Sequence, residues 1–255
     1  MPTRLRKTVF LMIKDGALYK SKRFREFIYV GDPLNTIRIF NDFQVDELII
    51  VDVDATTKQS PIQFEMLGLI AKHARMPIAY GGGINDTNQI ERILNLGFEK
   101  IVISKHAIMH PSFVLKASSI FGSQAVIVCI DLKYCRKKNT YEIFTDNGQT
   151  KAKVELNRIL QDFVKYKAGE ILINSIDADG TYKGYKSDIL NQINVYLPMP
   201  ITLLGGGASN SEIEKLMKEK SIHLAAGSLW TFYNKTNAVL LNYPERVDEA
   251  STIIQ

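Results

Sequence analysis

The strongest constraint on the fold is an internal repeat at about half the length of the 255-residue chain. The segment DELIIVDVDAT (46–56) matches GEILINSIDADGT (169–181), and MPIAYGGGIND (76–86) matches MPITLLGGGASN (199–210). A third pair, KIVISKHAI (100–108) and IHLAAGSLW (222–230), is more weakly similar. Repetition at a half-chain period predicts two similar halves joined in one fold.

Short β-rich runs alternate with amphipathic helical patterns, which predicts a parallel sheet. The predicted strands are residues 7–13, 47–53, 77–81, 99–104, 125–131, 169–175, 199–205 and 221–226. Helical patterns lie at 32–43, 60–74, 86–97 and 209–220. Eight strands in two halves predict an α/β chain with one domain over residues 1–255, a (βα)8 TIM barrel built from two similar half-barrels. An open doubly wound sheet is the alternative, but no GxGxxG motif follows the first strand.

The first strands of the two halves, in VFLMIKDG (9–16) and VIVCIDLK (126–133), overlay at an offset of 119 residues. This overlay places Met12 opposite Asp131. Side chains at the C-terminal ends of barrel strands face the active site. We therefore expect a polar rim, which comprises Asp52, Asp54, Asp131, Asn174, Asp177 and Asp179.

Two runs of three glycines, 81–83 and 205–207, each end a predicted strand and precede a polar helix start. Glycine lets the backbone approach an oxyanion closely, and free N–H groups can then bind it. The next strand of each half ends in small or polar residues. The sequence therefore predicts one phosphate site per half, and a long substrate with a phosphate at each end. The predicted phosphate-binding residues are Gly82, Gly83, Ser104, Gly206, Gly207, Gly227 and Ser228.

The charge pattern argues against a nucleic-acid partner, because the net charge of +5 is scattered along the chain. The one dense basic stretch, KSKRFREF (20–27), predicts either a solvated loop or a mobile loop that holds an anionic substrate. No apolar run reaches the ~18 residues that cross a bilayer, and the apolar run near the N-terminus is too short for a signal peptide core. We therefore expect no membrane partner and a cytoplasmic protein. Cys129 and Cys135 form no CxxC or Cys/His cluster, so neither a metal site nor a cofactor is predicted.

Several motifs together resemble the cyclase subunit of imidazole glycerol phosphate synthase. They are GDPLNTIRIFNDFQVDELIIVDVDAT, PIAYGGGI, FGSQAVIVCIDLK, AGEILINSIDADGTYKGY and AAGSLW, and the resemblance covers about residues 4 to 232. It implies a (βα)8 barrel that forms a heterodimer with a glutaminase. Ammonia from that subunit would travel through the barrel to a small substrate, a bisphosphorylated ribonucleotide at the C-terminal rim.

The resemblance also implies catalytic residues. The family uses two aspartates, at the ends of the first and fifth strands, as general acid and base. Asp131 matches the second aspartate, but Met12 stands in the place of the first, and a thioether cannot carry a proton. Lys14, Asp15 or Asp179 could take over its part. Lys20 matches a loop lysine that helps to close the site, and Asp179 matches a rim acid near the substrate.

At the opposite mouth of the barrel, the resemblance implies an ammonia gate of four charged residues at strand starts. The matching residues here are Arg6, Glu47, Lys100 and Glu170. Two positive and two negative side chains can pair into a neutral ring, which makes a buried charge cluster tolerable.

Two hypotheses follow, and both rest on the resemblance. The first is an ammonia-dependent cyclase that has diverged at Met12. The second is an ammonia-channelling subunit of an amidotransferase complex that makes acetamidino sugars for surface polysaccharide. It is suggested by the segment TFYNKTNAVLLNYP (231–244), which is similar to a paralogous branch that also lacks the first-strand acid. A related histidine-pathway isomerase ranks lower, because it needs neither a gate nor a glutaminase.

Overall fold

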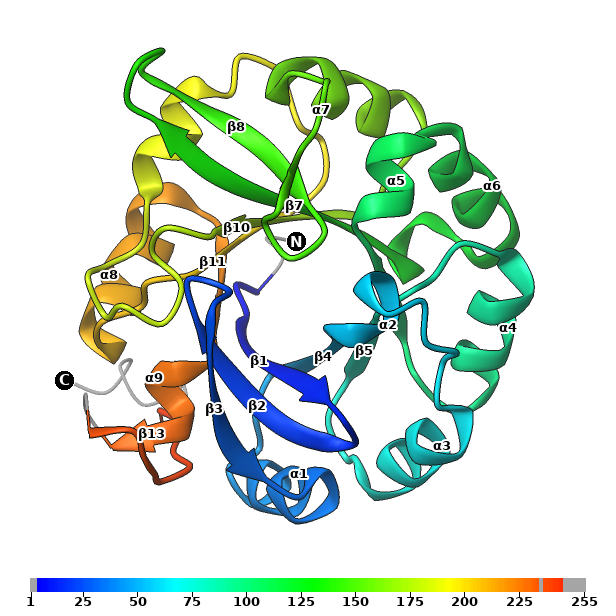
Figure 1. The fold of residues 1–255 in the computed structure, drawn as a ribbon, viewed down its shortest axis with the longest axis vertical. Helices are drawn as coiled ribbons and strands as arrows, with labels where there is room; N and C mark the ends of the chain where they lie inside the picture. The colour runs from blue at the N-terminus through cyan, green and yellow to red at the C-terminus, as the bar shows by residue number, and fades with distance from the viewer. Residues whose placement is uncertain (1–3, 234–235, 245–255) are drawn as a thin grey trace, which may run out of the picture.

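Eight parallel strands close into a barrel in the computed structural model, which describes residues 4–233 and 236–244 (Figure 1). The barrel strands are β1 (Lys7–Lys14), β4 (Glu47–Asp52), β5 (Ile78–Gly81), β6 (Lys100–Ile103), β7 (Val126–Cys135), β10 (Glu170–Ser175), β11 (Ile201–Leu204) and β12 (His223–Ala226). Pairing of β12 with β1 closes the ring. The predicted (βα)8 barrel is therefore confirmed. Its strand ends differ from the predicted ones by one or two residues, except that β7 runs four residues further.

Helices surround the barrel (Figure 1). The longer ones are α1 (Pro33–Asp42), α3 (Phe64–His73), α4 (Thr87–Asn95), α6 (Ser112–Phe121), α7 (Leu156–Lys165) and α8 (Asn210–Lys220). The shorter ones are α2 (Asp54–Thr57), α5 (Lys105–Met109), α9 (Ser228–Thr231) and the 3-10 turns η1 (Ser123–Ala125) and η2 (Ser187–Gln192). The start of α4 is set by a capping box, in which the Asp86 side chain caps the helix and Gln89 Oε1 accepts from Asp86 N–H at 3.1 Å. Within the described ranges, no helix has the length and apolarity to span a membrane.

Each half also carries an antiparallel excursion on the C-terminal rim. In the first half, β2 (Ala17–Lys22) and β3 (Glu26–Gly31) form a hairpin that pairs with β1. In the second half, β8 (Thr140–Thr145) and β9 (Thr150–Lys151) extend β7 in the same way. The basic stretch 20–27 is therefore the end of β2, a turn and the start of β3, and not the predicted loop. The sequence reading missed this because the apolar residues there do not alternate cleanly.

The strand register shows which residues of the two halves are equivalent. Met12 on β1 lies opposite Val51 on β4, and Asp131 on β7 lies opposite Asn174 on β10. Val51 and Asn174 occupy the same place in the 123-residue repeat. The register therefore agrees with the 119-residue offset that pairs Met12 with Asp131.

Apolar side chains pack in two layers that the barrel wall separates. One cluster lies between the strands and the helices. The other fills the barrel and consists of Phe10, Met12, Ile49, Ala79, Val102, Ile127, Cys129, Leu172, Leu204 and Ala225. Because strand side chains alternate between the two faces, residues two apart share a layer. The inner layer separates the C-terminal mouth of the barrel from the N-terminal mouth.

After β12, the described residues form a short helix and a small antiparallel pair. The helix is α9, and the pair consists of β13 (Phe232–Tyr233) and β14 (Ala238–Val239). Trp230 is fully buried, and its ring lies 5.0 Å from that of Tyr243, whose hydroxyl donates to Lys7 O at 2.6 Å. Residues 234–235 of the segment 231–244, which suggested the paralogous branch, lie outside the described residues.

Candidate active site

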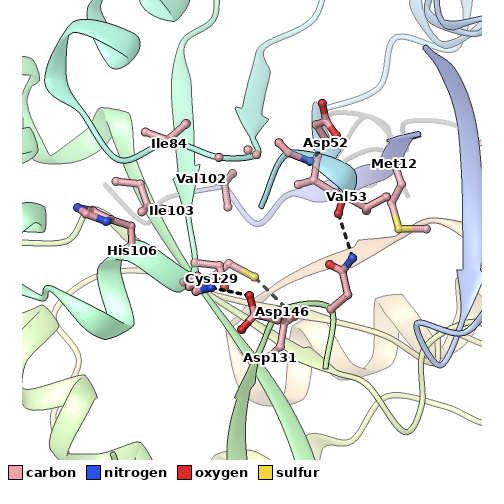
Figure 2. Close-up of a pocket in the computed structure, with 18 of the residues that line it drawn as sticks. Met12, Asp52, Val53, Ile84, Val102, Ile103, His106, Cys129, Asp131 and Asp146 are labelled. Atoms are coloured by element: carbon pink, nitrogen blue, oxygen red, sulfur yellow. Dashed lines mark hydrogen bonds and ion pairs between the residues drawn. The ribbon is translucent and has the colours of Figure 1, made fainter. Parts of the chain in front are cut away.

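A cavity of about 680 Å³ opens at the C-terminal mouth of the barrel (Figure 2). Side chains from both halves line it, and it has the size and mixed polarity of a small-molecule site. Of the predicted rim residues, Asp52, Asp131, Asn174 and Asp179 contribute to its lining. The predicted catalytic acids and the first glycine run therefore share one cavity.

Asp131 is the acid best placed for proton transfer. It projects from β7 into the cavity and accepts from Asn174 Nδ2 at 2.9 Å, and Cys129 Sγ lies 4.0 Å from it (Figure 2). Burial raises the pKa of Asp131 to about 7, with the Asn174 hydrogen bond acting against the rise and the charge of Asp179 adding to it. A carboxyl group with this pKa can exchange a proton near neutral pH.

Met12 occupies the equivalent place in the first half and lies in a different kind of surrounding. It is only 4% exposed, and it lines the same cavity as Asp131 (Figure 2). Its neighbour on β4 is Val51, which cannot donate a hydrogen bond as Asn174 does for Asp131. The first half therefore lacks both the acid and the amide that would position it.

Two of the three residues considered as substitutes for the missing first-strand acid, Lys14 and Asp15, do not line the cavity. Lys14 and Asp15 pair with each other at 2.7 Å, and Lys58 also binds Asp15, at 3.0 Å. Asp15 has a side chain that is 61% exposed, and neither residue is among the described residues that line the cavity. Asp179 does line the cavity, so it is the remaining one of the three.

Lys20 and Asp179 lie together where the β2–β3 hairpin packs on the loop after β10. Lys20 is 2% exposed, and its Nζ donates to Phe10 O at 3.0 Å. Burial lowers the pKa of Lys20 to about 8, although the charge of Asp179 opposes the shift. Asp179 accepts from Ser21 Oγ at 2.5 Å, and burial raises its pKa despite the nearby Lys20. The hairpin thus brings a base and an acid to the second-half rim.

The two predicted phosphate sites lie in opposite halves and differ in size. Gly82, Gly83 and Ser104 line the large cavity. A second hollow of about 20 Å³ is lined by Gly206, Gly207, Gly227 and Ser228. Lys20, from the β2–β3 hairpin, lines this hollow too. A Cβ at Gly227 would lie 2.6 Å from Phe10 O, so the backbone there needs a glycine.

The four charged residues at strand starts come together at the N-terminal mouth. Lys100 Nζ donates to Glu47 Oε1 at 2.5 Å and to Glu170 Oε2 at 3.2 Å. Arg6 Nη2 donates to Glu170 Oε2 at 2.6 Å, and Arg6 Nε lies 3.4 Å from Glu47 Oε2. The two cations and two anions form a neutral ring, which we call the charged ring.

Threonine hydroxyls hold the two carboxylates of the charged ring. Thr8 Oγ1 donates to Glu47 Oε2 at 3.0 Å, and Thr202 Oγ1 donates to Glu170 Oε1 at 2.6 Å. Burial alone would raise the pKa of Glu170, but Lys100, Arg6 and Thr202 hold it below its ordinary value. Glu170 therefore stays ionised in the ring.

His223 is a fifth member of this mouth that the sequence reading missed. His223 lies opposite Thr202 on β11, and Lys100 lies opposite Ala79 on β5. Each residue of the first pair follows its equivalent in the second pair by 123 residues, so His223 is the counterpart of Lys100. Its Nδ1 accepts from Arg6 N–H at 2.9 Å, so the proton of the neutral imidazole is on Nε2. Burial and the charge of Arg6 lower the pKa of His223 to about 4. Carrying Lys100 forward by 123 residues would have found it.

We expect His223→Gln to flatten the pH dependence of stability in weak acid. Between pH 6.5 and 4 the unfolded chain protonates this histidine and the folded chain does not, so the free energy of unfolding falls as the pH falls. The wild-type protein should lose about 2 kcal/mol more than the variant, after allowance for solvent screening at the open mouth. Urea unfolding at pH 7 and pH 4.5 measures this. The control variant His73→Gln, at a half-buried histidine on α3, should behave like wild type, and equal losses in all three proteins would contradict the assignment.

A turn of the second excursion reaches over the first half of the rim. Asp146, after β8, binds Lys105 Nζ at 2.6 Å, and Asn147 Nδ2 donates to Val53 O at 2.9 Å. Both turn residues line the large cavity. The ion pair between Lys105 and Asp146 joins residues 41 positions apart in the chain, so no local sequence pattern indicates it.

Comparison with known proteins places these features in a family. The family model described as "Histidine biosynthesis protein" matches residues 11–236. A Leptospira borgpetersenii protein, provisionally named imidazole glycerol phosphate synthase subunit HisF, is 40% identical over 240 residues, 94% of each chain. A Pseudomonas aeruginosa protein, provisionally named subunit hisF2, is 38% identical over 92% of this chain and 94% of its own. The imidazole glycerol phosphate synthase subunit HisF of Lactococcus lactis is 33% identical over 89% of this chain and 88% of its own.

Proposed function

The chain belongs to the HisF-like family of imidazole glycerol phosphate synthase cyclase subunits, and we propose that it is the ammonia-consuming subunit of a glutamine-dependent enzyme. The proposed reaction adds ammonia to a bisphosphorylated ribonucleotide, closes an imidazole ring, and splits the substrate into an imidazole phosphate and an aminoimidazole carboxamide ribotide. The observation that carries the proposal is one barrel with a neutral charged ring at one mouth and Asp131 at the other.

The charged ring is the proposed entry for ammonia. A glutaminase subunit that docks on the N-terminal mouth, as a heterodimer, would release ammonia beside Arg6, Glu47, Lys100 and Glu170. Beyond the ring lies the apolar inner layer, which includes Ile49, Leu172 and Ala225. An isolated ion pays a large cost in such a layer, and a neutral molecule does not. The passage would therefore carry NH₃ and hold back NH₄⁺.

At the C-terminal mouth, Asp131 is the proposed proton carrier. When the ammonia nitrogen attacks the substrate carbon, a new N–C bond forms and the nitrogen must lose a proton. The Asp131 carboxylate can accept that proton and return it to a leaving oxygen, because its pKa of about 7 makes both forms available. Lys20 and Asp179, at the second-half rim, would hold the substrate. The two glycine-lined hollows would take its phosphates.

A second function has a specific observation in its favour. Both Met12 and its neighbour Val51 lack the polar groups that the second half has in Asp131 and Asn174. The absence of an acid at position 12, with no polar side chain beside it at position 51, suggests that the full cyclisation is not required. In this case the barrel would pass ammonia to another acceptor, and a nucleotide-linked sugar that receives an acetamidino group is the candidate.

The test is turnover of the bisphosphorylated ribonucleotide by the purified chain with excess ammonium salt and without a partner. Robust turnover would support the cyclase. If there is no turnover, but the ribonucleotide still raises the melting temperature, the phosphate sites have been kept and the ammonia-delivery function is favoured. If the ribonucleotide is neither turned over nor raises the melting temperature, the result contradicts the cyclase proposal.

A further inference from the structure

The large cavity is not confined to the barrel mouth, because it continues over the end of one strand. Val102 and Ile103 are neighbours on β6 and point to opposite faces of the sheet. Val102 belongs to the inner cluster, and Ile103 belongs to the cluster between strands and helices. Both nevertheless line the same cavity. The cavity therefore passes over the C-terminal end of β6 to the outside of the barrel wall.

We call this outer part the side arm. Among the residues that line the cavity, Ile84, Asn85, Gln89, Ile103, His106 and His110 are assigned to this arm. In Figure 2, Ile84, Ile103 and His106 lie on the other side of Val102 from Met12 and Asp52. A ligand that occupies both the barrel mouth and the side arm must cross the rim beside Ser104 and Lys105.

The corresponding rim of the second half differs from that of the first, although the halves share one fold. There the residues Lys20, Asp179 and Tyr182 line a hollow of only about 20 Å³. Tyr182 donates to Ser228 O at 3.1 Å, and Tyr185 donates to Ala225 O at 2.9 Å. Two aromatic side chains therefore pack at that rim. A symmetric barrel with asymmetric space suits a ligand with one larger end.

The walls of the side arm suit a planar ring. Ile84 and Ile103 offer apolar surface, and the imidazole of His106 is held edge-on by Phe113 at 4.6 Å and 87°. His110 lies 4.9 Å from His106. Burial and His110 together lower the pKa of His106, so its ring is neutral at pH 7. A neutral aromatic ring beside apolar side chains favours stacking of another aromatic ring.

Polar groups suited to reading the edge of such a ring are also present. Gln89 Oε1 accepts from Asn85 N at 2.9 Å and from Asp86 N at 3.1 Å, which fixes the amide and leaves its Nε2 hydrogens to donate. At the crossing, Lys105 Nζ is 2.6 Å from Asp146 Oδ1, and the Lys105 side chain is 44% exposed. An exposed ion pair is weak, so an anionic linker can share or take this ammonium group.

We propose that the side arm binds the heteroaromatic base of a nucleoside diphosphate-linked ligand, whose diphosphate crosses the rim at Lys105. The inference rests on the second function proposed above and names where the nucleotide of its acceptor lies. The base sits against His106 outside the barrel wall, and the group attached to the diphosphate reaches the barrel mouth near Asp131.

The experiment measures binding, not turnover, by calorimetry with uridine 5′-diphosphate, adenosine 5′-diphosphate and inorganic pyrophosphate. At least one nucleoside diphosphate should bind ten-fold or more tightly than pyrophosphate, because only the nucleotides carry a base. His106→Ala should remove most of this advantage. Lys105→Met should weaken nucleotide and pyrophosphate alike and keep their ratio. His73→Ala, a histidine on α3 away from the cavity, should change nothing.

Two results would overturn the proposal: equal binding of pyrophosphate and both nucleotides by the wild-type protein, or an unchanged ratio in a folded His106→Ala variant. Should His106→Ala fail to fold, the exposed His110→Ala serves instead, with a smaller expected loss of the ratio and the same contrary result. Failure of the cyclase or ammonia-delivery reaction leaves these binding ratios untouched, so the two failures are distinguishable.

Discussion

Replacing Met12 with aspartate is expected to raise ammonium-driven turnover of the bisphosphorylated ribonucleotide by about 10²-fold, the lower range of what one positioned acid contributes. Met12 faces the cavity that Asp131 enters, and the strand register makes the two positions equivalent. A carboxyl group at position 12 would be buried like that of Asp131, so its pKa should also rise toward neutrality. Proton donation and acceptance would then be possible from both sides of the substrate.

Positions 12 and 131 differ in the residue opposite them on the next strand. Asp131 is oriented by Asn174, whereas an aspartate at position 12 would lie beside Val51. The double variant Met12→Asp, Val51→Asn should therefore exceed the single variant, because it restores the hydrogen bond as well as the acid. Rates with saturating ammonium salt measure this without any glutaminase.

Matched controls separate acid chemistry from altered packing. Met12→Leu keeps an apolar side chain of similar volume and should leave the rate unchanged. Adding Asp131→Asn to Met12→Asp should abolish the gain, because one acid would again be missing. If the folded Met12→Asp, Val51→Asn variant binds the ribonucleotide but turns it over no faster than wild type does, a simple loss of one acid is ruled out.

The sequence predicted most of the barrel because the repeat and the strand alternation are local patterns that survive in one chain. The equivalence of Met12 and Asp131 needed only the spacing of two similar strands, and the register agrees with it. His223 could have been found in the same way, by carrying Lys100 forward by 123 residues, although a lone histidine at a strand start gives no signal of its own.

Other features depend on contacts between segments far apart in the chain, which no local pattern records. The sequence pattern around Lys20 fits either a solvated loop or a substrate-binding loop, and Lys20 is buried because the β2–β3 hairpin packs on the loop at Asp179. The small glycine-lined hollow of the second half is likewise lined by Lys20 from that hairpin and by Asp179 and Tyr182, which follow β10. The side arm exists only where α5, the loop at Pro61 and the start of α4 leave a gap.

Lys100→Met is expected to destabilise the protein by about 3–5 kcal/mol, because it removes one cation from a buried ion cluster and leaves a carboxylate uncompensated. Glu47 and Glu170 are 1% and 4% exposed, and Lys100 is hydrogen-bonded to both. Methionine keeps the length of the lysine stem, so the lost charge and not a cavity dominates. In a chain of 255 residues this loss should lower the melting temperature by on the order of 10 °C.

A companion change tests whether the orphaned charge is the cause. Lys100→Met combined with Glu47→Gln keeps one cation, Arg6, for the one remaining carboxylate, Glu170, and should recover part of the stability. Lys105→Met is the matched control, because its partner Asp146 lies at the opposite mouth and the lysine is 44% exposed. Such an exposed pair should cost at most ~1 kcal/mol.

Lys100→Met should also distinguish ammonia released from glutamine by the partner from ammonia supplied as an ammonium salt. With the glutaminase present, Lys100→Met should lower the glutamine-driven rate several-fold relative to the ammonium-driven rate. In the proposed function, ammonia from the partner passes the charged ring, whereas external ammonia can reach the C-terminal mouth directly. Comparing the two rates in one preparation cancels any loss of folded protein. A glutamine-to-ammonium ratio equal to that of wild type, in a variant destabilised as expected, would mean that the ring holds the barrel together and takes no part in ammonia passage.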